Sequence, residues 1–172
     1  MRNILVIDFD GVINNERLED EYLHFELPDT FHQYNIDLVN NIKTIISHYD
    51  FELLISSTWR KDFDIERMQY FVNEIWGWNT KVVGYTSDDF LDRDYRERFE
   101  WDPNADHRER GMQITQWMEN NKSFMQGRKY VVIDDSHDAK YGHENQFFSV
   151  NCTTGFDQEH LESFIKFIGD MK

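Results

Sequence analysis

The stretch Asn3-Ile4-Leu5-Val6-Ile7-Asp8-Phe9-Asp10-Gly11 decides the fold of this 172-residue chain. A short apolar run that ends directly in polar residues is typical of a buried strand, which we expect over residues 3–8. Side chains two positions apart lie on the same side of an extended chain, so Asp8 and Asp10 are predicted to point the same way. Gly11 then allows the backbone to turn sharply.

Similar apolar runs predict the rest of a sheet. Three further buried strands are expected over residues 51–56, 130–134 and 147–150, with a weaker candidate over 81–85. Between them, apolar residues recur at spacings of three and four, which is the pattern of amphipathic helices. Helices are expected over residues 37–49, from a cap at Asp62 or Asp64 to Ile75, around residues 114–118, and after a cap at Asp157. Strands that alternate with helices predict the α/β class, here a Rossmann-like, doubly wound, mostly parallel five-stranded sheet with helices on both faces.

Length and composition fit one domain over residues 1–172. The net charge of −15 repels nucleic acid at long range but leaves room for a local basic groove. Cys152 is the only cysteine and has no intramolecular partner, which favours a reducing, cytoplasmic setting. No apolar run is long enough for a signal core or a membrane span, so we expect a soluble protein.

Residues 88–110 differ in composition from the rest of the chain. They hold five of the ten arginines, interleaved with four aromatic residues. We expect an elaborate loop, which is either a solvated, salt-bridged surface or a surface for a substrate or partner. Arginines beside stacking aromatics suit single-stranded nucleic acid.

Reactive side chains follow three of the predicted strands. Asp8 and Asp10 follow the first, Ser56-Ser57-Thr58 follows the second, and Asp134-Asp135 follows the strand over residues 130–134. Ligands of α/β sheets bind beyond the carboxyl ends of the strands, where these groups would meet. Four clustered carboxylates need a counter-charge, and Mg²⁺ is a natural one. Each motif alone is common in turns or helix caps; their order and shared position favour a site.

These motifs resemble the signatures of the haloacid dehalogenase (HAD) superfamily. Asp8-Phe9-Asp10-Gly11-Val12 resembles the first signature, Ser56 the second and Asp134-Asp135 the fourth, in chain order. The third signature usually carries a lysine, and Arg110, followed by Gly111, is similar to it in position. Three other cations remain alternatives for this role: Arg108, Lys122 and Lys129.

The resemblance implies a phosphatase mechanism. Asp8 would attack phosphorus to form an aspartyl-phosphate, while Asp10 acts as general acid and then as general base. Ser56, Ser57 and Arg110 would bind the phosphoryl oxygens. Mg²⁺ would be held by Asp8, by Asp10 through its backbone carbonyl, and by Asp134 and Asp135, the last through water or by orienting the site.

The gaps between the motifs leave no room for a full cap domain, so we expect little or no cap and an open site. The layout resembles the HAD domains of polynucleotide kinase-phosphatases and RNA-repair proteins, which implies polynucleotide 3′- or 5′-phosphate ends as a substrate. A small-metabolite phosphatase, an Asp-rich metal nuclease and a non-catalytic HAD-like binding module remain alternatives. The oligomeric state does not follow from the sequence.

Overall fold

A computed structural model describes residues 2–15, 23–27, 30–87 and 109–171, and side chains are described outside residues 16–32 and 88–108. Five strands form one sheet in the order β5-β4-β1-β6-β7, and every neighbouring pair is parallel. Their bounds are β1 (Asn3–Ile7), β4 (Phe51–Ile55), β5 (Val82–Tyr85), β6 (Tyr130–Asp134) and β7 (Phe147–Ser149). The predicted Rossmann-like α/β fold is confirmed, with a sheet that is wholly parallel.

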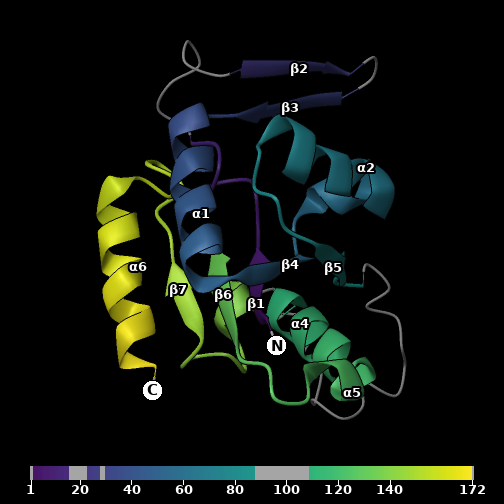
Figure 1. Cartoon of the computed structure of the whole chain (residues 1–172), viewed down its shortest axis with the longest axis vertical. Helices are drawn as coiled ribbons and strands as arrows, with labels where there is room; N and C mark the ends of the chain where they lie inside the picture. Colours follow the sequence, from purple (N-terminus) through teal and green to yellow (C-terminus); the bar gives the residue numbers. More distant parts are fainter. Residues whose placement is uncertain (1, 16–22, 28–29, 88–108, 172) are drawn as a thin grey trace.

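Helices cover both faces of this sheet, as Figure 1 shows, with α1 and α6 on one face and α4 and α5 on the other. Their bounds are α1 (Ile36–Tyr49), α2 (Ile65–Tyr70), α4 (Glu109–Asn120), α5 (Lys122–Met125) and α6 (Gln158–Asp170). Asp64 caps α2 and Asp157 caps α6, as predicted, by accepting from backbone N–H groups in the first turn. The end of the predicted second helix, Phe71–Ile75, is π-helical. Among the described residues, no helix is long and apolar enough to cross a membrane.

The central strand β1 separates two apolar layers. Leu5 and Ile7 face the larger layer, which is built with α1, α2 and α6. Ile4 and Val6 face the smaller one, which includes Ile114 of α4. Burial of each such side chain contributes about 1.5–3 kcal/mol, so the alternation along β1 fixes its register in the sheet. The end of β1, and with it Asp8, is therefore held firmly.

An antiparallel hairpin, β2 (Leu23–Leu27) and β3 (Thr30–Tyr34), was not expected from the sequence. It lies between β1 and α1 in the chain, at the end of the molecule above α1 and α2 in Figure 1. Within the described residues this hairpin, rather than a further domain, fills that gap, in agreement with a minimal cap. Assignment of the whole chain to a single domain stays a prediction.

The predicted loop over residues 88–110 needs a correction at its end. Glu109 and Arg110 belong to the first turn of α4, because the helix begins at Glu109. Residues 88–108 lie outside the described part of the chain. The expected substrate or partner surface there stays a prediction.

Candidate active site

The site lies where the chain reverses its direction across the sheet. From β1 the chain proceeds outward to β4 and β5 and then returns to β6 and β7 on the other side. A crevice beyond the carboxyl ends of the strands is expected at such a switch point. Backbone hydrogen bonds join the strand ends, from Asp8 N–H to the Ile133 carbonyl (3.1 Å) and from Ser56 N–H to the Ile7 carbonyl (2.9 Å). Residues predicted from separate motifs therefore meet here.

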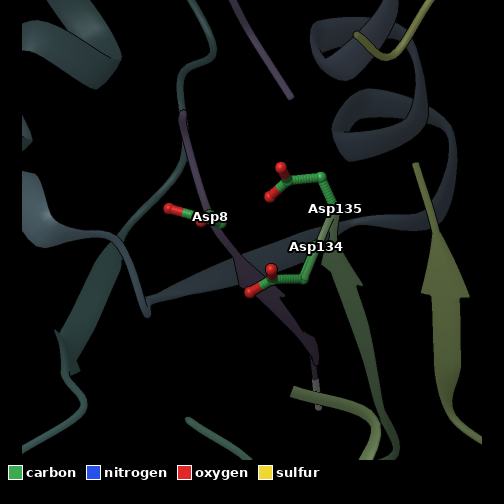
Figure 2. Close-up of side chains that lie close together, drawn as sticks. All are labelled: Asp8, Asp134 and Asp135. Carbon is green, nitrogen blue, oxygen red and sulfur yellow. The ribbon is translucent and has the colours of Figure 1, made fainter. Parts of the chain in front are cut away.

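Three carboxylates converge on one point. Asp8, Asp134 and Asp135 each offer an oxygen, and these oxygens lie within 4.8 Å of one another (Figure 2). Asp8 is 2% exposed and Asp134 is fully buried. Gly11 has a φ of +74°, and a Cβ there would lie 2.4 Å from Asp135 Oδ2, so only glycine leaves this carboxylate in place. Hard, closely spaced oxygen donors of this kind fit Mg²⁺.

Asp10 is not a member of this carboxylate group. Its Oδ1 accepts from Trp59 Nε1 (3.0 Å) and Asn14 Nδ2 (3.0 Å), and its Oδ2 lies 3.1 Å from Thr58 Oγ1. The predicted metal role of Asp10 gains no support for the side chain, and a role of its backbone carbonyl stays a prediction. Its exposed carboxylate lines the mouth of a cavity of about 670 Å³ that also reaches Asp8 and Arg110. This position suits a group that exchanges protons with a substrate.

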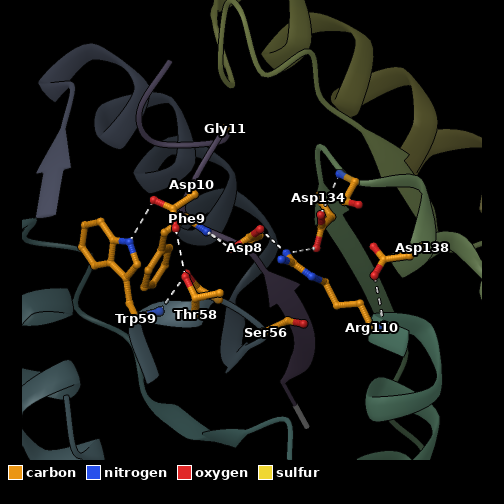
Figure 3. Close-up of polar contacts among 12 residues, drawn as sticks. Asp8, Phe9, Asp10, Gly11, Ser56, Thr58, Trp59, Arg110, Asp134 and Asp138 are labelled. Carbon is orange, nitrogen blue, oxygen red and sulfur yellow. Dashed lines mark hydrogen bonds and ion pairs between the residues drawn. The ribbon is translucent and has the colours of Figure 1, made fainter. Parts of the chain in front are cut away.

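Arg110 supplies the positive charge of the site. Its Nη1 makes an ion pair with Asp8 Oδ2 and lies 3.0 Å from Asp134 Oδ2 (Figure 3). Burial raises the pKa of Asp8 to about 6, although the Arg110 charge opposes this shift. Burial and the neighbouring Asp8 charge likewise raise the pKa of Asp134, and burial raises that of Asp135. Burial alone would lower the pKa of Arg110, but the two carboxylates outweigh it and keep the guanidinium charged.

The other candidates for the third signature lie elsewhere. The Lys129 carbonyl accepts from Ile4 N–H, which puts Lys129 at the opposite end of the sheet. Lys122 opens α5 and lines a separate cavity with Tyr130 and Arg128. Arg108 lies outside the described residues. Of the cations that are described, Arg110 is the one that contacts the carboxylates.

The first turn of α4 is fixed by neighbours that the sequence did not suggest. A Cβ on Gly111 would lie 2.3 Å from the Tyr141 carbonyl oxygen, so glycine allows the helix to approach closely. His143 Nε2 lies 2.9 Å from the Gly111 carbonyl, and its Nδ1 lies 2.8 Å from the Tyr130 hydroxyl. Burial lowers the pKa of His143, and a neutral ring that donates from Nε2 and accepts at Nδ1 satisfies both partners. Arg110 is thereby presented to Asp8 from a rigid support.

Ser56 and Ser57 have different environments. Ser56 Oγ is fully buried and has no hydrogen-bond partner among the described residues. An unsatisfied buried hydroxyl costs about 1–3 kcal/mol, so a phosphoryl oxygen would be a favourable partner. Ser57 Oγ instead accepts from Trp59 N–H (3.3 Å) as the cap of a short 3₁₀ turn, Thr58–Lys61. The geometry supports a structural role for the Ser57 side chain, and its predicted phosphate contact stays untested.

Arg60 connects this loop to α4. Its guanidinium donates to the carbonyls of Ser56 (2.9 Å) and Ser57 (2.6 Å) and to Gln113 Oε1 (3.2 Å). The loop that carries Ser56 and the helix that carries Arg110 are thus held together. No motif in the sequence assigned this role to Arg60.

The family model described as "HAD domain in Swiss Army Knife RNA repair proteins" matches residues 4–161. The chain belongs to this family. The match covers every carboxylate of the site and every strand of the sheet except Asn3, the first residue of β1. No curated protein matches the sequence. As a HAD domain, the chain has a site of the HAD phosphatase type in general.

Proposed function

We propose that this HAD domain is a Mg²⁺-dependent phosphomonoesterase that acts through an aspartyl-phosphate on Asp8 and removes terminal phosphates from RNA. One observation carries the proposal: Asp8, a buried carboxylate at the end of β1, lies against Arg110 and near Ser56, whose buried hydroxyl has no hydrogen-bond partner among the described residues. A structural ion pair alone would not explain why Asp134 and Asp135 crowd the same point, at a cost in carboxylate repulsion.

The chemistry follows from the positions of these side chains. Asp8 forms a bond to phosphorus while the bond to the leaving oxygen breaks, and Asp10 gives its proton to that oxygen. Asp10 then takes a proton from water, which attacks the aspartyl-phosphate and restores the Asp8 carboxylate as inorganic phosphate leaves. Arg110 and Ser56 bind the phosphoryl oxygens, and they stabilise the charge that develops on these oxygens during both steps.

Asp8, Asp134 and Asp135 are the residues that would hold Mg²⁺. The fit rests on their hard oxygen donors and on their burial, which raises the pKa values of Asp8 and Asp134 although the charge of Arg110 opposes these shifts. Bound there, the cation would neutralise the carboxylates and the incoming phosphate and so lower the barrier for attack by an anion.

RNA ends are the substrate that the family description favours, since the family comprises HAD domains of RNA repair proteins. The open cavity of about 670 Å³ beside Asp10 would admit the terminal nucleotide of a longer chain. The net charge of −15 opposes RNA at long range and instead favours the alternative, a small-metabolite phosphatase.

A paired substrate screen tests the choice. Oligoribonucleotides with 3′- or 5′-terminal phosphates are compared with common phosphometabolites in Mg²⁺, with Asp8→Asn as the control. We expect kcat/KM to be highest for one class of RNA end. Equal or better turnover of a metabolite would overturn the proposal that RNA ends are the substrate. Cleavage of internal diesters without release of phosphate would indicate a nuclease.

A further inference from the structure

The two carboxylate oxygens of Asp10 have different kinds of hydrogen-bond partner. Oδ1 faces two nitrogen atoms, Trp59 Nε1 and Asn14 Nδ2, each at 3.0 Å. Oδ2 faces a hydroxyl, Thr58 Oγ1, at 3.1 Å. Figure 3 shows Trp59 and Thr58 on the loop after β4, both turned toward Asp10. The difference determines which oxygen can carry a proton.

Oδ1 can act only as an acceptor. An indole N–H donates and never accepts. The orientation of the Asn14 amide is fixed by Gly11, whose backbone N–H can only donate and lies 2.6 Å from Asn14 Oδ1. The amide nitrogen of Asn14 must therefore face Asp10 and donate to it as well. A proton on Oδ1 would use acceptor capacity that these two donors need, so at least one of them would lose its acceptor.

Oδ2 is compatible with either protonation state, because the Thr58 hydroxyl can donate to a carboxylate or accept from a carboxylic acid. We infer that Trp59 and Asn14 are positioning residues that keep Oδ1 of Asp10 as an acceptor, so that Oδ2 is the oxygen that protonates the leaving group and later accepts a proton from water. The inference rests on the proposed function, since it assigns the proton-transfer atom of the same reaction.

Trp59 is rigid enough for this role. Its side chain is 3% exposed and makes edge-to-face contacts with Phe9 (centroids 5.2 Å apart) and Phe63 (6.3 Å), and it also packs on Trp76 (6.2 Å). Phe9 separates Asp8 from Asp10 in the chain, so the same aromatic cluster holds the backbone between the two carboxylates. An N–H on a ring that cannot rotate freely is a preorganised donor, and proton transfer depends strongly on such placement.

Trp76 offers a matched control. It belongs to the same cluster and is also 3% exposed, but its Nε1 has no hydrogen-bond partner among the described residues. Trp59→Phe and Trp76→Phe therefore remove a similar ring from one cluster, and only the first removes a donor to Asp10. The readout is the single-turnover rate of Asp8 phosphorylation. It is measured with a 3′-phosphorylated oligoribonucleotide, whose leaving group needs a proton, and with 4-nitrophenyl phosphate, whose leaving group does not.

Trp59→Phe is expected to slow the RNA reaction by roughly tenfold or more, as a partial loss of general-acid catalysis, and the nitrophenyl reaction by less than about threefold. Trp76→Phe is expected to change neither by more than about threefold. An equal loss on both substrates after Trp59→Phe would show a merely structural role and overturn the inference. The absence of any loss would overturn it too.

A second measurement needs no turnover. The indole N–H exchange rates of Trp59 and Trp78 are compared by NMR between the unsubstituted protein and Asp10→Ala. Trp78 donates to the Val39 carbonyl (3.1 Å) and should not respond, whereas Trp59 exchange should accelerate by roughly tenfold once its charged acceptor is gone. Unchanged exchange at Trp59 overturns the assignment. Faster exchange at Trp59 in a protein that hydrolyses neither substrate would show that the Trp59–Asp10 hydrogen bond is present while the proposed function fails, so the two failures can be told apart.

Discussion

Two carboxylates of one short motif lie in opposite environments: Asp8 on the buried floor of the site and Asp10 at its exposed mouth. Asp8 on the floor is 2% exposed, pairs with Arg110 and has its pKa raised to about 6 by burial. Asp10 at the mouth is exposed and is held by the neutral donors Trp59, Asn14 and Thr58. A buried anion beside a cation suits covalent attack, and an exposed acid with one oxygen that can carry a proton suits proton transfer. The environments, rather than the residue type, divide the two roles.

The largest expected effect separates the two carboxylates. Asp8→Asn removes the attacking oxygen, so turnover should fall by about four powers of ten or more on every substrate. Asp10→Asn should retain part of the first step with 4-nitrophenyl phosphate, because that leaving group needs no proton. Steady-state and single-turnover assays with both substrates test the difference. Retention of more than a few per cent of activity by Asp8→Asn would contradict the role of Asp8 as the nucleophile.

Removal of the metal should come next in size. EDTA should stop turnover, and Asp134→Ala should reproduce this loss because it deletes a buried carboxylate of the same cluster. Differential scanning calorimetry should show that Mg²⁺ raises the Tm of the unsubstituted protein and raises the Tm of Asp134→Ala much less. Activity that survives complete metal removal would show that the cluster has another purpose.

Arg110→Ala should lower kcat by about two to three powers of ten for RNA and for small phosphate esters alike, since both share the phosphoryl group. Arg110→Lys should recover part of the loss, because lysine keeps the charge without the forked geometry. Arg67, on the exposed surface of α2, provides an arginine-to-alanine control that should stay near normal. A near-normal Arg110→Ala enzyme would transfer the role to Arg108.

The smallest effect concerns how the free energy of unfolding of the metal-free protein changes with pH. The pKa of Asp8 is about 6 in the folded protein against an ordinary value of 3.8, so the folded state binds more protons between these pH values. Stability contributed by the protonated Asp8 is full below pH 3.8 and is lost as pH rises through 6. Urea unfolding in EDTA should show that, as pH rises over this range, the free energy of unfolding of Asp8→Asn increases relative to that of the unsubstituted protein by up to about 3 kcal/mol. If the relative stability of Asp8→Asn fell as pH rises, the raised pKa of Asp8 would be contradicted.

The sequence predicted which residues meet on the floor of the site, because these residues follow or end the strands of the sheet. Apolar runs that stop at Asp8, Ser56 and Asp134 show which residues leave the sheet, and parallel pairing then brings them together. The same reasoning placed Arg110 near this edge, since its helix precedes β6. Periodicity and order along the chain were enough for this part of the site.

The mouth and the hairpin could not be predicted in the same way. The partners of Asp10 depend on the rotamer of Trp59 and the orientation of an amide, neither of which leaves a sequence period. The hairpin has a weak signal in the sequence: Leu23, Phe25 and Leu27 alternate with polar residues before Pro28-Asp29, a typical turn pair. His143 and Gly111 pair across more than thirty positions, a contact set by tertiary packing alone.

Detection of a phosphoenzyme tests the central claim most directly. Asp10→Asn should slow hydrolysis of the aspartyl-phosphate more than its formation from 4-nitrophenyl phosphate, so the intermediate should accumulate. After rapid acid quenching, peptide mass spectrometry should find one phosphate on Asp8, and hydroxylamine should remove it. The Asp8→Asn and Asp10→Asn double variant should carry none. Hydrolysis of substrate without any phosphate on Asp8, or with the phosphate on another residue, would contradict the account.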